Sequence, residues 1–537
     1  MKFRITGFAN GLLSLLISQI LIKIFGVIYS LYMTNKGGFG DTGNAIYMSG
    51  YQIYALILTI SSVGVPNSIS KLISEKDSIN DYKNANRIFY ISIFMFSIIG
   101  FMGCLLMFFL SGFIADNILL IPESRLSLMV LSPAVLFVSI ASVIRGYCNG
   151  EGKIAITAKS QFFEQVLKSI FTILFVEIIS KKSNNNVELM AASANGATTV
   201  ATFFSLVYII IKYNLINKGN EESRVNYFQY ENINIIIKKI ILISVPITVS
   251  ALLTSLSKNI DSITIVRILK KFFSEGEAIK KYGIISSKVD ILIAFPLSFN
   301  TAISTVLIPE ISRNIAKNDI NKATNKIKKS LFITLIILVP STFGMYFYSD
   351  EIFLLLFPKA IMGAELLRIA SISILFSGLA QTLAGALQGF GKNSIPLCAT
   401  IFGILGKIIC NIVFINIKGI YEKGAIVGNI VLSIIMFLFE YIYLNKYINI
   451  RTNIIKNSFF PTIFSIIMIM VSKEIYNYLN IIIDNNISIL VSIIICIIIY
   501  SAFFMIYLLN IRKKQASPET IENTWMYMTN MREIIKK

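Results

Sequence analysis

The sequence predicts an all-α polytopic membrane protein with about 14 transmembrane helices. Three observations predict this fold class: a mean hydropathy of +0.71, a hydrophobic share of 55%, and many apolar runs of about 20 residues. A soluble chain of 537 residues would instead divide into several domains with shorter apolar segments. Barrel strands would alternate in polarity and be about half as long, so the spans are predicted to be helices.

Clusters of Pro, Gly, Asn and charged residues separate the apolar runs and mark the loops between them. The first run contains Lys23 and is too long for the hydrophobic region of a signal peptide, so we interpret it as the first membrane helix. The predicted spans cover residues 10–33, 44–66, 88–112, 125–146, 156–180, 188–212, 239–267, 282–306, 330–349, 365–387, 395–417, 423–445, 456–478 and 485–511.

One stretch of sequence occurs twice and divides the chain into two halves. Each copy joins two spans by a short glycine-rich turn and places a lysine, Lys168 or Lys407, in the middle of the second span. One offset of 239 residues (392 − 153 = 407 − 168) aligns both the turns and these lysines. The turn residues are Arg145, Gly150, Gly152 and Lys153 in the first copy, and Gly389, Gly391 and Lys392 in the second. Since each half has an even number of spans, the halves are predicted to be parallel six-helix repeats.

The repeat predicts five segments: an N-terminal lobe at 1–215, an inter-lobe loop at 216–238, a C-terminal lobe at 239–447, two added helices at 448–514 and a tail at 515–537. Lys and Arg are concentrated in the loops on the N-terminal side of the membrane. This bias predicts that both termini, the inter-lobe loop and the glycine-rich turns are cytoplasmic, and that the 268–281 loop is external.

The composition argues against several other classes of protein. A net charge of +20 could indicate nucleic-acid binding, but the lysines lie in short loops that would face an anionic membrane leaflet. The chain has no histidine, and its five cysteines show no paired spacing, so we expect no metal site and no disulfide framework. No nucleophile with a base partner and no nucleotide fingerprint is found, so neither an enzyme nor a cofactor is predicted.

Ionisable residues inside the predicted spans are the main candidates for function, because a charge near the centre of a membrane helix costs roughly 2.5–3.5 kcal/mol. The lysines outnumber the carboxylates: Lys23, Lys168, Lys258, Lys288 and Lys407 against Glu164, Asp261 and Asp290. This excess predicts a cavity that favours an anion such as phosphate. We hypothesise an anionic-headgroup site at Lys23, Lys258 and Lys288, with Asp261 and Asp290 beside it.

One alternative stays open for the ionisable residues, and another for the glycine-rich turns. Glu164 with Lys168, and Lys258 with Asp261, have the i,i+4 and i,i+3 spacings of ion pairs within one helix. The glycine-rich turns are similar to a fragment of a phosphate-binding loop, but neither has the preceding strand or the full G-x-x-x-x-G-K-[ST] spacing. A tight turn whose glycines let helix ends approach is the favoured interpretation.

Several segments resemble the stage V sporulation protein B group over most of residues 1–450. They are Gly64-Val65-Pro66, Ile69-Ser70-Lys71-Leu72, Arg145-Gly146-Tyr147, Glu164-Gln165, Val245-Pro246-Ile247-Thr248 leading to Asp261, and Ile308-Pro309-Glu310-Ile311-Ser312. This group belongs to the multidrug/oligosaccharidyl-lipid/polysaccharide (MOP) flippase superfamily and is similar to MurJ-type lipid II flippases. The resemblance implies a two-lobed, V-shaped, MATE-like transporter fold of fourteen helices.

The resemblance also implies a function. The expected substrate is an undecaprenyl-pyrophosphate-linked oligosaccharide, moved by alternating access across the bacterial cytoplasmic membrane for cell-wall or spore-cortex peptidoglycan. Lys23 matches a basic position of the family, whereas Ile291 replaces the Arg of an Asp-Arg pair and leaves Lys288 as its candidate substitute. A monomer is expected, with Na⁺ or H⁺ as candidate coupling ions. The alternatives are a multidrug or cation antiporter of the same fold and a non-transporting scaffold for wall-synthesis enzymes.

Overall fold

The computed structural model describes residues 21–22, 24–62, 64–79, 81–218, 230–316, 318–358, 362–447 and 454–515. These residues contain many helices and no strand, and eleven of the helices are long and apolar enough to cross a membrane. Two further long helices, α7 (Ile154–Lys182) and α9 (Ile233–Leu269), carry several charges along their length. The predicted all-α polytopic fold is therefore confirmed, and fourteen spans are consistent with it. Lys23 lies outside the described residues.

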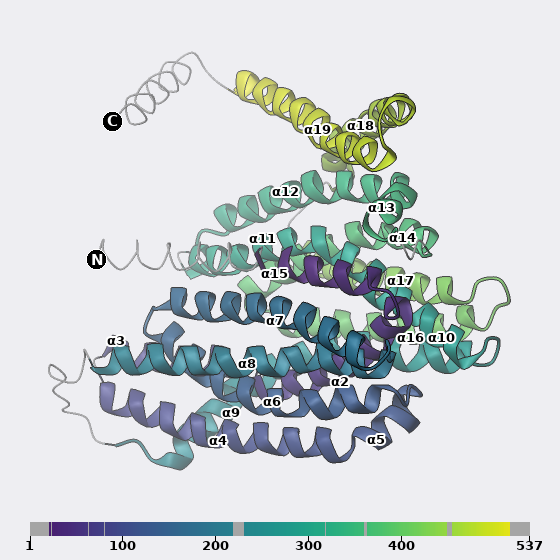
Figure 1. Cartoon of the computed structure of the whole chain (residues 1–537). Coiled ribbons are helices and arrows are strands. Elements are labelled where there is room, and N and C mark those ends of the chain that lie inside the picture. Colours follow the sequence, from purple (N-terminus) through teal and green to yellow (C-terminus); the bar gives the residue numbers. More distant parts are fainter. Residues whose placement is uncertain are drawn as a thin grey trace, which may run out of the picture.

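The first half of the chain is a bundle in which α6 packs against α4 and α8, and α8 packs against α7 (Figure 1). Residues 24–35 form its first described helix. The others are α2 (Gly40–Ser62), α3 (Gly64–Ser78), α4 (Tyr82–Phe109), α5 (Ser111–Phe113), the π-helix η1 (Ile114–Leu119), α6 (Ser124–Gly150), α7 and α8 (Val187–Lys218).

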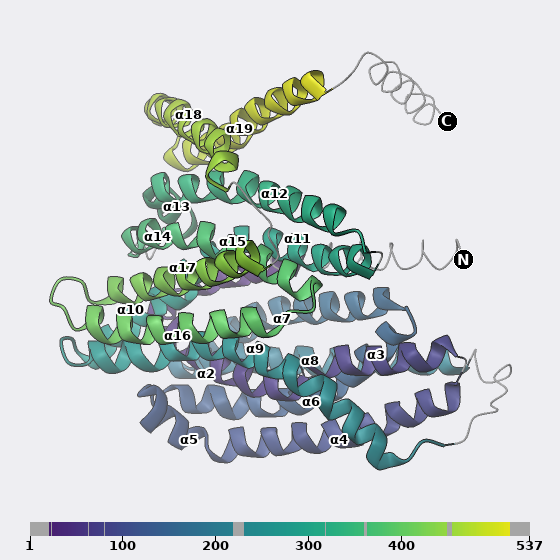
Figure 2. The same ribbon diagram turned by 180° about the vertical axis from the view of Figure 1, so that it is seen from behind.

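The second half forms a similar bundle, in which α16 packs against α17 and α15 packs against α11 and α17. Its elements are α10 (Glu275–Ile284), the π-helix η3 (Ile285–Val289), α11 (Asp290–Ala316), α12 (Ile320–Phe347), α13 (Ser349–Leu356), α14 (Ala364–Ala370), α15 (Ile372–Gly389), α16 (Ser394–Ile415) and α17 (Glu422–Tyr447). The helices α18 (Ile454–Ile482) and α19 (Asn485–Gln515) pack on α12, at the edge of the molecule far from the first half (Figure 2).

The long helix α9 connects the two halves. Its beginning packs against α3 and α4 of the first half, and its later turns pack against α10 and α16 of the second. The approach to α3 is close, because a Cβ atom on Gly64 would lie 2.5 Å from the carbonyl oxygen of Ser244. A glycine is therefore required where α3 begins against α9.

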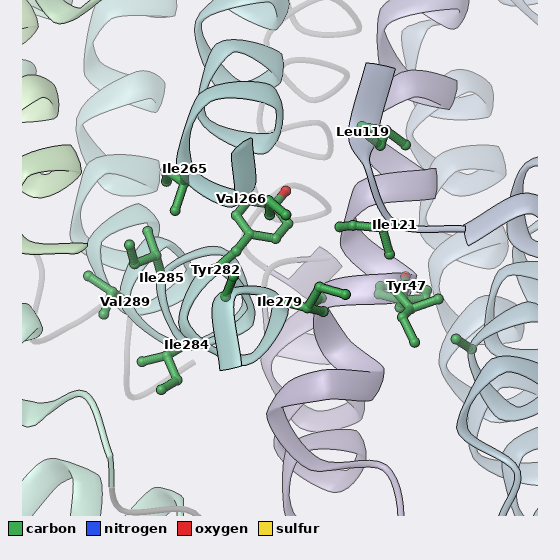
Figure 3. Packing of buried hydrophobic residues seen from close by; sticks show 14 of the residues in the cluster. Tyr47, Leu119, Ile121, Ile265, Val266, Ile279, Tyr282, Ile284, Ile285 and Val289 are labelled. Carbon is green, nitrogen blue, oxygen red and sulfur yellow. The ribbon is translucent and has the colours of Figure 1, made fainter. Parts of the chain in front are cut away.

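Buried apolar side chains of the two halves form a shared core at one end of the molecule. A shared core combines α2, η1 and α6 with the end of α9, α10, η3, α13 and α14; Tyr47, Leu119, Val266, Ile279 and Tyr282 are among its members (Figure 3). At the opposite end, one cluster belongs to the first half with the start of α9, and another belongs to the second half. The two glycine-rich turns lie beside these separate clusters.

Candidate functional site

Both glycine-rich turns end their first helix in the same way. In the first turn, the Lys153 N–H donates to the Cys148 carbonyl at 2.8 Å and the Gly152 N–H donates to the Asn149 carbonyl at 3.0 Å. The matching bonds of the second turn, Lys392 to Leu387 and Gly391 to Gln388, are both 2.9 Å long. This is the Schellman motif, which needs a left-handed residue, and φ is +78° at Gly152 and +74° at Gly391.

The turns also bring neighbouring helices together. A Cβ atom on Gly150 would lie 2.7 Å from the Cβ of Ile73, and one on Gly389 would lie 2.7 Å from the Cβ of Ile311. The N–H groups of Gly152 and Lys153 are used inside the turn, so they do not form the free N–H cradle of a phosphate-binding loop. This geometry is that of a tight helix connection.

Arg145 lies in helix α6 and not in the turn that the sequence analysis assigned to it. Its guanidinium Nη2 is 2.7 Å from Glu164 Oε2 on α7 and donates to Ser160 Oγ at 3.0 Å and Ser205 Oγ at 2.9 Å. Glu164 thus pairs with an arginine of another helix, which corrects the proposed i,i+4 pair with Lys168. The arginine fits here because three side-chain acceptors surround its buried guanidinium.

The two lysines that the repeat aligns are both buried, but their surroundings differ. Each lies 15 residues after the lysine of its turn (168 − 153 and 407 − 392), and they are 5% and 1% exposed. Lys168 Nζ lies 4.1 Å from the centre of the Tyr51 ring and 5.4 Å from that of Tyr29, so aromatic faces stabilise its charge. Lys407 has a carboxylate partner instead.

Lys407 forms an ion pair with Asp261 that joins three helices. Lys407 Nζ on α16 is 2.7 Å from Asp261 Oδ2 on α9, and it donates to the Ser257 carbonyl at 2.7 Å. The amides of Asn411 and Asn429 complete the hydrogen bonding of the carboxylate, at 3.2 Å and 3.4 Å. Asp261 is therefore paired across helices, and the proposed i,i+3 pair with Lys258 is wrong.

Lys258 is exposed, although it lies in the middle of α9. It precedes Ile265 by seven residues, about two helical turns, so the two side chains share a helix face. Ile265 is fully buried in the shared core. The helix face that is buried at Ile265 is therefore exposed at Lys258. Asp290 at the start of α11 interacts electrostatically with the charges of Lys258, Asp261 and Lys407.

Lys288 lies at the closed end, in the π-helix η3. It is fully buried, its Nζ is 2.7 Å from Asp41 Oδ1 on α2, and it donates to the Met362 carbonyl at 3.3 Å. The helices approach closely here, because a Cβ atom on Gly283 would lie 2.0 Å from the Asp41 carbonyl oxygen. The pair thus ties the first half to the second, and Lys288 is buried whereas Lys258 is exposed.

Sequence reasoning missed two acidic residues. Asp41 precedes the predicted start of the second span at residue 44, so it falls in a predicted loop. Glu440 lies inside the predicted span 423–445 and is fully buried. The signal for Glu440 was present, since any acid inside a span is costly. Among the described residues, no group of His, Cys, Asp and Glu could hold a metal ion.

Comparisons with known proteins agree with this architecture. The model of the polysaccharide biosynthesis protein family matches residues 8–315, more than half of the chain, and the MatE model matches residues 246–413. The chain is 24% identical over 428 residues to the lipid II flippase MurJ of Bacillus subtilis (strain 168), which covers 76% of this chain and 77% of that protein. It is 21% identical over 406 residues to stage V sporulation protein B of the same organism, covering 74% and 76%.

Solved structures show the same fold. A structure of lipid II flippase MurJ in an inward closed conformation matches with a TM-score of 0.70 at 18% identity, over 92% of this chain and 98% of that one. An inward-facing multidrug resistance MATE family transporter matches with a TM-score of 0.64 at 15% identity, over 82% and 98%. The family match shows that this multi-pass membrane protein belongs to the polysaccharide biosynthesis protein family, and its fold is the one shared by these transporters.

Proposed function

We propose that the protein is a flippase that moves a lipid-linked oligosaccharide across the membrane by alternating access. The observation that carries the proposal is Lys258, an exposed cation inside α9 on the face that the shared core buries at Ile265. Such a charge is costly unless it faces water or an anion. A pyrophosphate linkage supplies such an anion. The name of one relative, lipid II flippase, points to the same class of substrate.

The shape of the core supports an alternating mechanism. The halves share apolar packing and the Asp41–Lys288 pair at one end, whereas their cores are separate at the other. A headgroup would enter from the separated end and reach Lys258. Breaking the Asp41–Lys288 pair and the shared core would then open the opposite end. Because α9 packs on both halves, it is the helix through which binding near Lys258 would act on the closed end.

The finer assignment follows from the sequence. We infer an undecaprenyl-pyrophosphate-linked oligosaccharide similar to lipid II, a bacterial cytoplasmic membrane, and a separated end that faces the cytoplasm with both chain termini. Lys23 would contribute to the headgroup site together with Lys258. A cation antiporter would need an acidic or aromatic site, and the exposed Lys258 argues against one.

Replacing Lys258 by Gln tests the proposal. The variant should reach normal levels in the membrane, because the exposed side chain contributes little packing, yet it should lose most flipping activity. Lys258→Arg should retain part of the activity, because a phosphate accepts either cation. The measurement is the appearance of lipid II headgroups at the outer surface of cells that are depleted of their own flippases.

Lys322→Gln is the matched control, because it removes the same charge from a side chain that is 74% exposed at the start of α12. It should flip like the unaltered protein. Full rescue by a variant with both Lys23 and Lys258 changed to Gln would contradict the headgroup site. Unchanged or improved export of cationic drugs by that variant would instead favour the antiporter.

A further inference from the structure

Among the described residues, one buried acid differs from all the others. Four acidic residues are buried: Asp41, Asp81, Asp261 and Glu440. The first three pair with a lysine, at 2.7 Å to Lys288, 3.2 Å to Lys76 and 2.7 Å to Lys407. Glu440 on α17 is fully buried, and neither of its carboxyl oxygens has a hydrogen-bond partner within the described part of the chain. Within the described residues, its negative charge therefore has no partner to balance it.

Within the described residues, no helix around α17 supplies a partner to Glu440. Helix α15, which packs along α17, contains no titratable side chain. Lys407 on α16 is engaged by Asp261, and Lys423 on α17 is engaged by Glu365. Within the described ranges, Glu440 forms no hydrogen bond or ion pair with any titratable group of α9, α11, α12, α14, α16 or α17. These groups are Lys238, Lys239, Lys258, Asp261, Arg267, Asp290, Glu310, Lys322, Lys326, Lys328, Lys329, Tyr346, Glu365, Arg368, Cys398, Lys407, Cys410, Glu422, Lys423, Tyr441, Tyr443 and Lys446.

The corresponding position of the repeat carries no cation. The offset of 239 residues places Ala384 at the position of Arg145 (145 + 239) and Gly403 at that of Glu164 (164 + 239). The second half therefore lacks the ion pair that Arg145 and Glu164 form in the first half. Ser377 on α15 and Ser433 on α17 are hydrogen-bonded at 2.7 Å. Seven residues further along these two parallel helices stand Ala384 and Glu440, so Glu440 lies opposite a small neutral residue.

A carboxylate without a cation or a hydrogen-bond donor is strongly disfavoured inside a membrane helix bundle, whereas a protonated carboxyl group is neutral. We propose that Glu440 is a proton-binding site of the transport cycle, protonated in this conformation and deprotonated to water when α17 shifts against α15 and α16. This proposal rests on the proposed flippase function. The step is a proton transfer only, from the carboxyl group to water and back. Asn429 on the same helix contacts Asp261, so a shift of α17 would also reach the Lys407–Asp261 pair.

The first test does not depend on transport. Infrared spectra of the purified full-length protein at neutral pH should contain the carbonyl band of a protonated carboxyl group, and Glu440→Gln should remove it. Glu310→Gln is the control, since this acid is 40% exposed and pairs with Lys326. If Glu440→Gln does not fold, Glu440→Asp should move the band without removing it. A spectrum with no protonated carboxyl band that depends on residue 440 would overturn the proposal.

The second test links the proton to transport. A fluorescent lipid II analogue is reconstituted with the protein in liposomes, and its initial flipping rate is measured under imposed pH gradients. The flipping rate of the unaltered protein should change several-fold with the pH gradient. The flipping rate of Glu440→Gln should not depend on the gradient. An unchanged gradient response in Glu440→Gln would refute the role in transport. If the unaltered protein moves no analogue under any gradient, the flippase function fails, while the infrared result still decides whether Glu440 is protonated.

Discussion

At the scale of single residues, charges inside this protein are balanced by partners from other helices. Lys407 meets Asp261 across α16 and α9, Arg145 meets Glu164 across α6 and α7, and Lys288 meets Asp41 across η3 and α2. Pairs within one helix would stabilise only that helix, whereas these pairs also hold the bundle together. A buried pair of this kind contributes chiefly by penalising the loss of either partner.

The Lys407–Asp261 pair makes this expectation measurable. Lys407→Met should lower the free energy of unfolding by about 3–5 kcal/mol, because it leaves Asp261 buried without a counter-ion. The double variant Lys407→Met/Asp261→Leu should recover much of that loss, since no unpaired charge remains. Stability of the purified protein in detergent, followed by thermal or denaturant unfolding, gives the comparison.

Lys423→Met provides the control at a surface pair, because its partner Glu365 is 64% exposed. Its loss should be no more than about 1 kcal/mol. A Lys407→Met protein as stable as the unaltered one would show that water reaches Asp261, and the buried-pair interpretation would have to be abandoned.

At the scale of elements, the glycine-rich turns set how closely helices approach. Gly391 supplies the left-handed backbone of the second turn, and Gly389 lets α15 touch α11. The residues at the same positions of the first turn do the same between α6 and α3. The two turns are equivalent because the backbone geometry of a Schellman motif depends on local sequence, which the repeat preserves.

Alanine substitutions should separate these two roles. Gly391→Ala should cost roughly 1–2 kcal/mol, the price of a left-handed residue with a Cβ. Gly389→Ala should be more damaging, because its Cβ would lie 2.7 Å from Ile311 Cβ and 3.1 Å from the Ile308 carbonyl oxygen. Gly276→Ala is the control, since a Cβ there meets nothing within 4 Å. Thermal stability in detergent ranks the three, and a Gly389→Ala protein as stable as Gly276→Ala would contradict the close contact.

At the scale of the whole molecule, the arrangement of cores makes the two membrane faces unequal. One end carries the shared core and the short elements α5, α10, α13 and α14, and the other carries the separate clusters and the glycine-rich turns. From the distribution of Lys and Arg in the loops we propose that the separated end faces the cytoplasm. The orientation decides from which side a substrate would enter in this conformation.

Cysteine labelling checks the orientation. A membrane-impermeant thiol reagent added to intact cells should modify Ser274→Cys, just before α10, and miss Asn318→Cys, just before α12. Both residues are exposed, so both should react once the membrane is permeabilised. The protein without an introduced cysteine is the control. Labelling of Asn318→Cys and not Ser274→Cys in intact cells would reverse the topology and place the separated end outside.

The sequence by itself determined the membrane class, the helical spans and the repeat. These features depend on local properties: the length of apolar runs, the glycines of a turn, and the fixed spacing from each turn to Lys168 or Lys407. Local spacing also suggested ion pairs within single helices, and there it was wrong for Glu164 and Asp261. The sequence shows that a charge inside a span is costly, but it does not show which residue pairs with that charge.

Only the tertiary structure decided which charges are balanced and which end is closed. The partner of Asp261 lies 146 residues away in the chain, on a helix whose rotation depends on its packing neighbours. Lys258 is exposed and Lys288 is buried because of where the shared core ends along α9, η3 and α2. The isolation of Glu440 has the same origin, because a missing partner becomes visible only when every surrounding helix is in place.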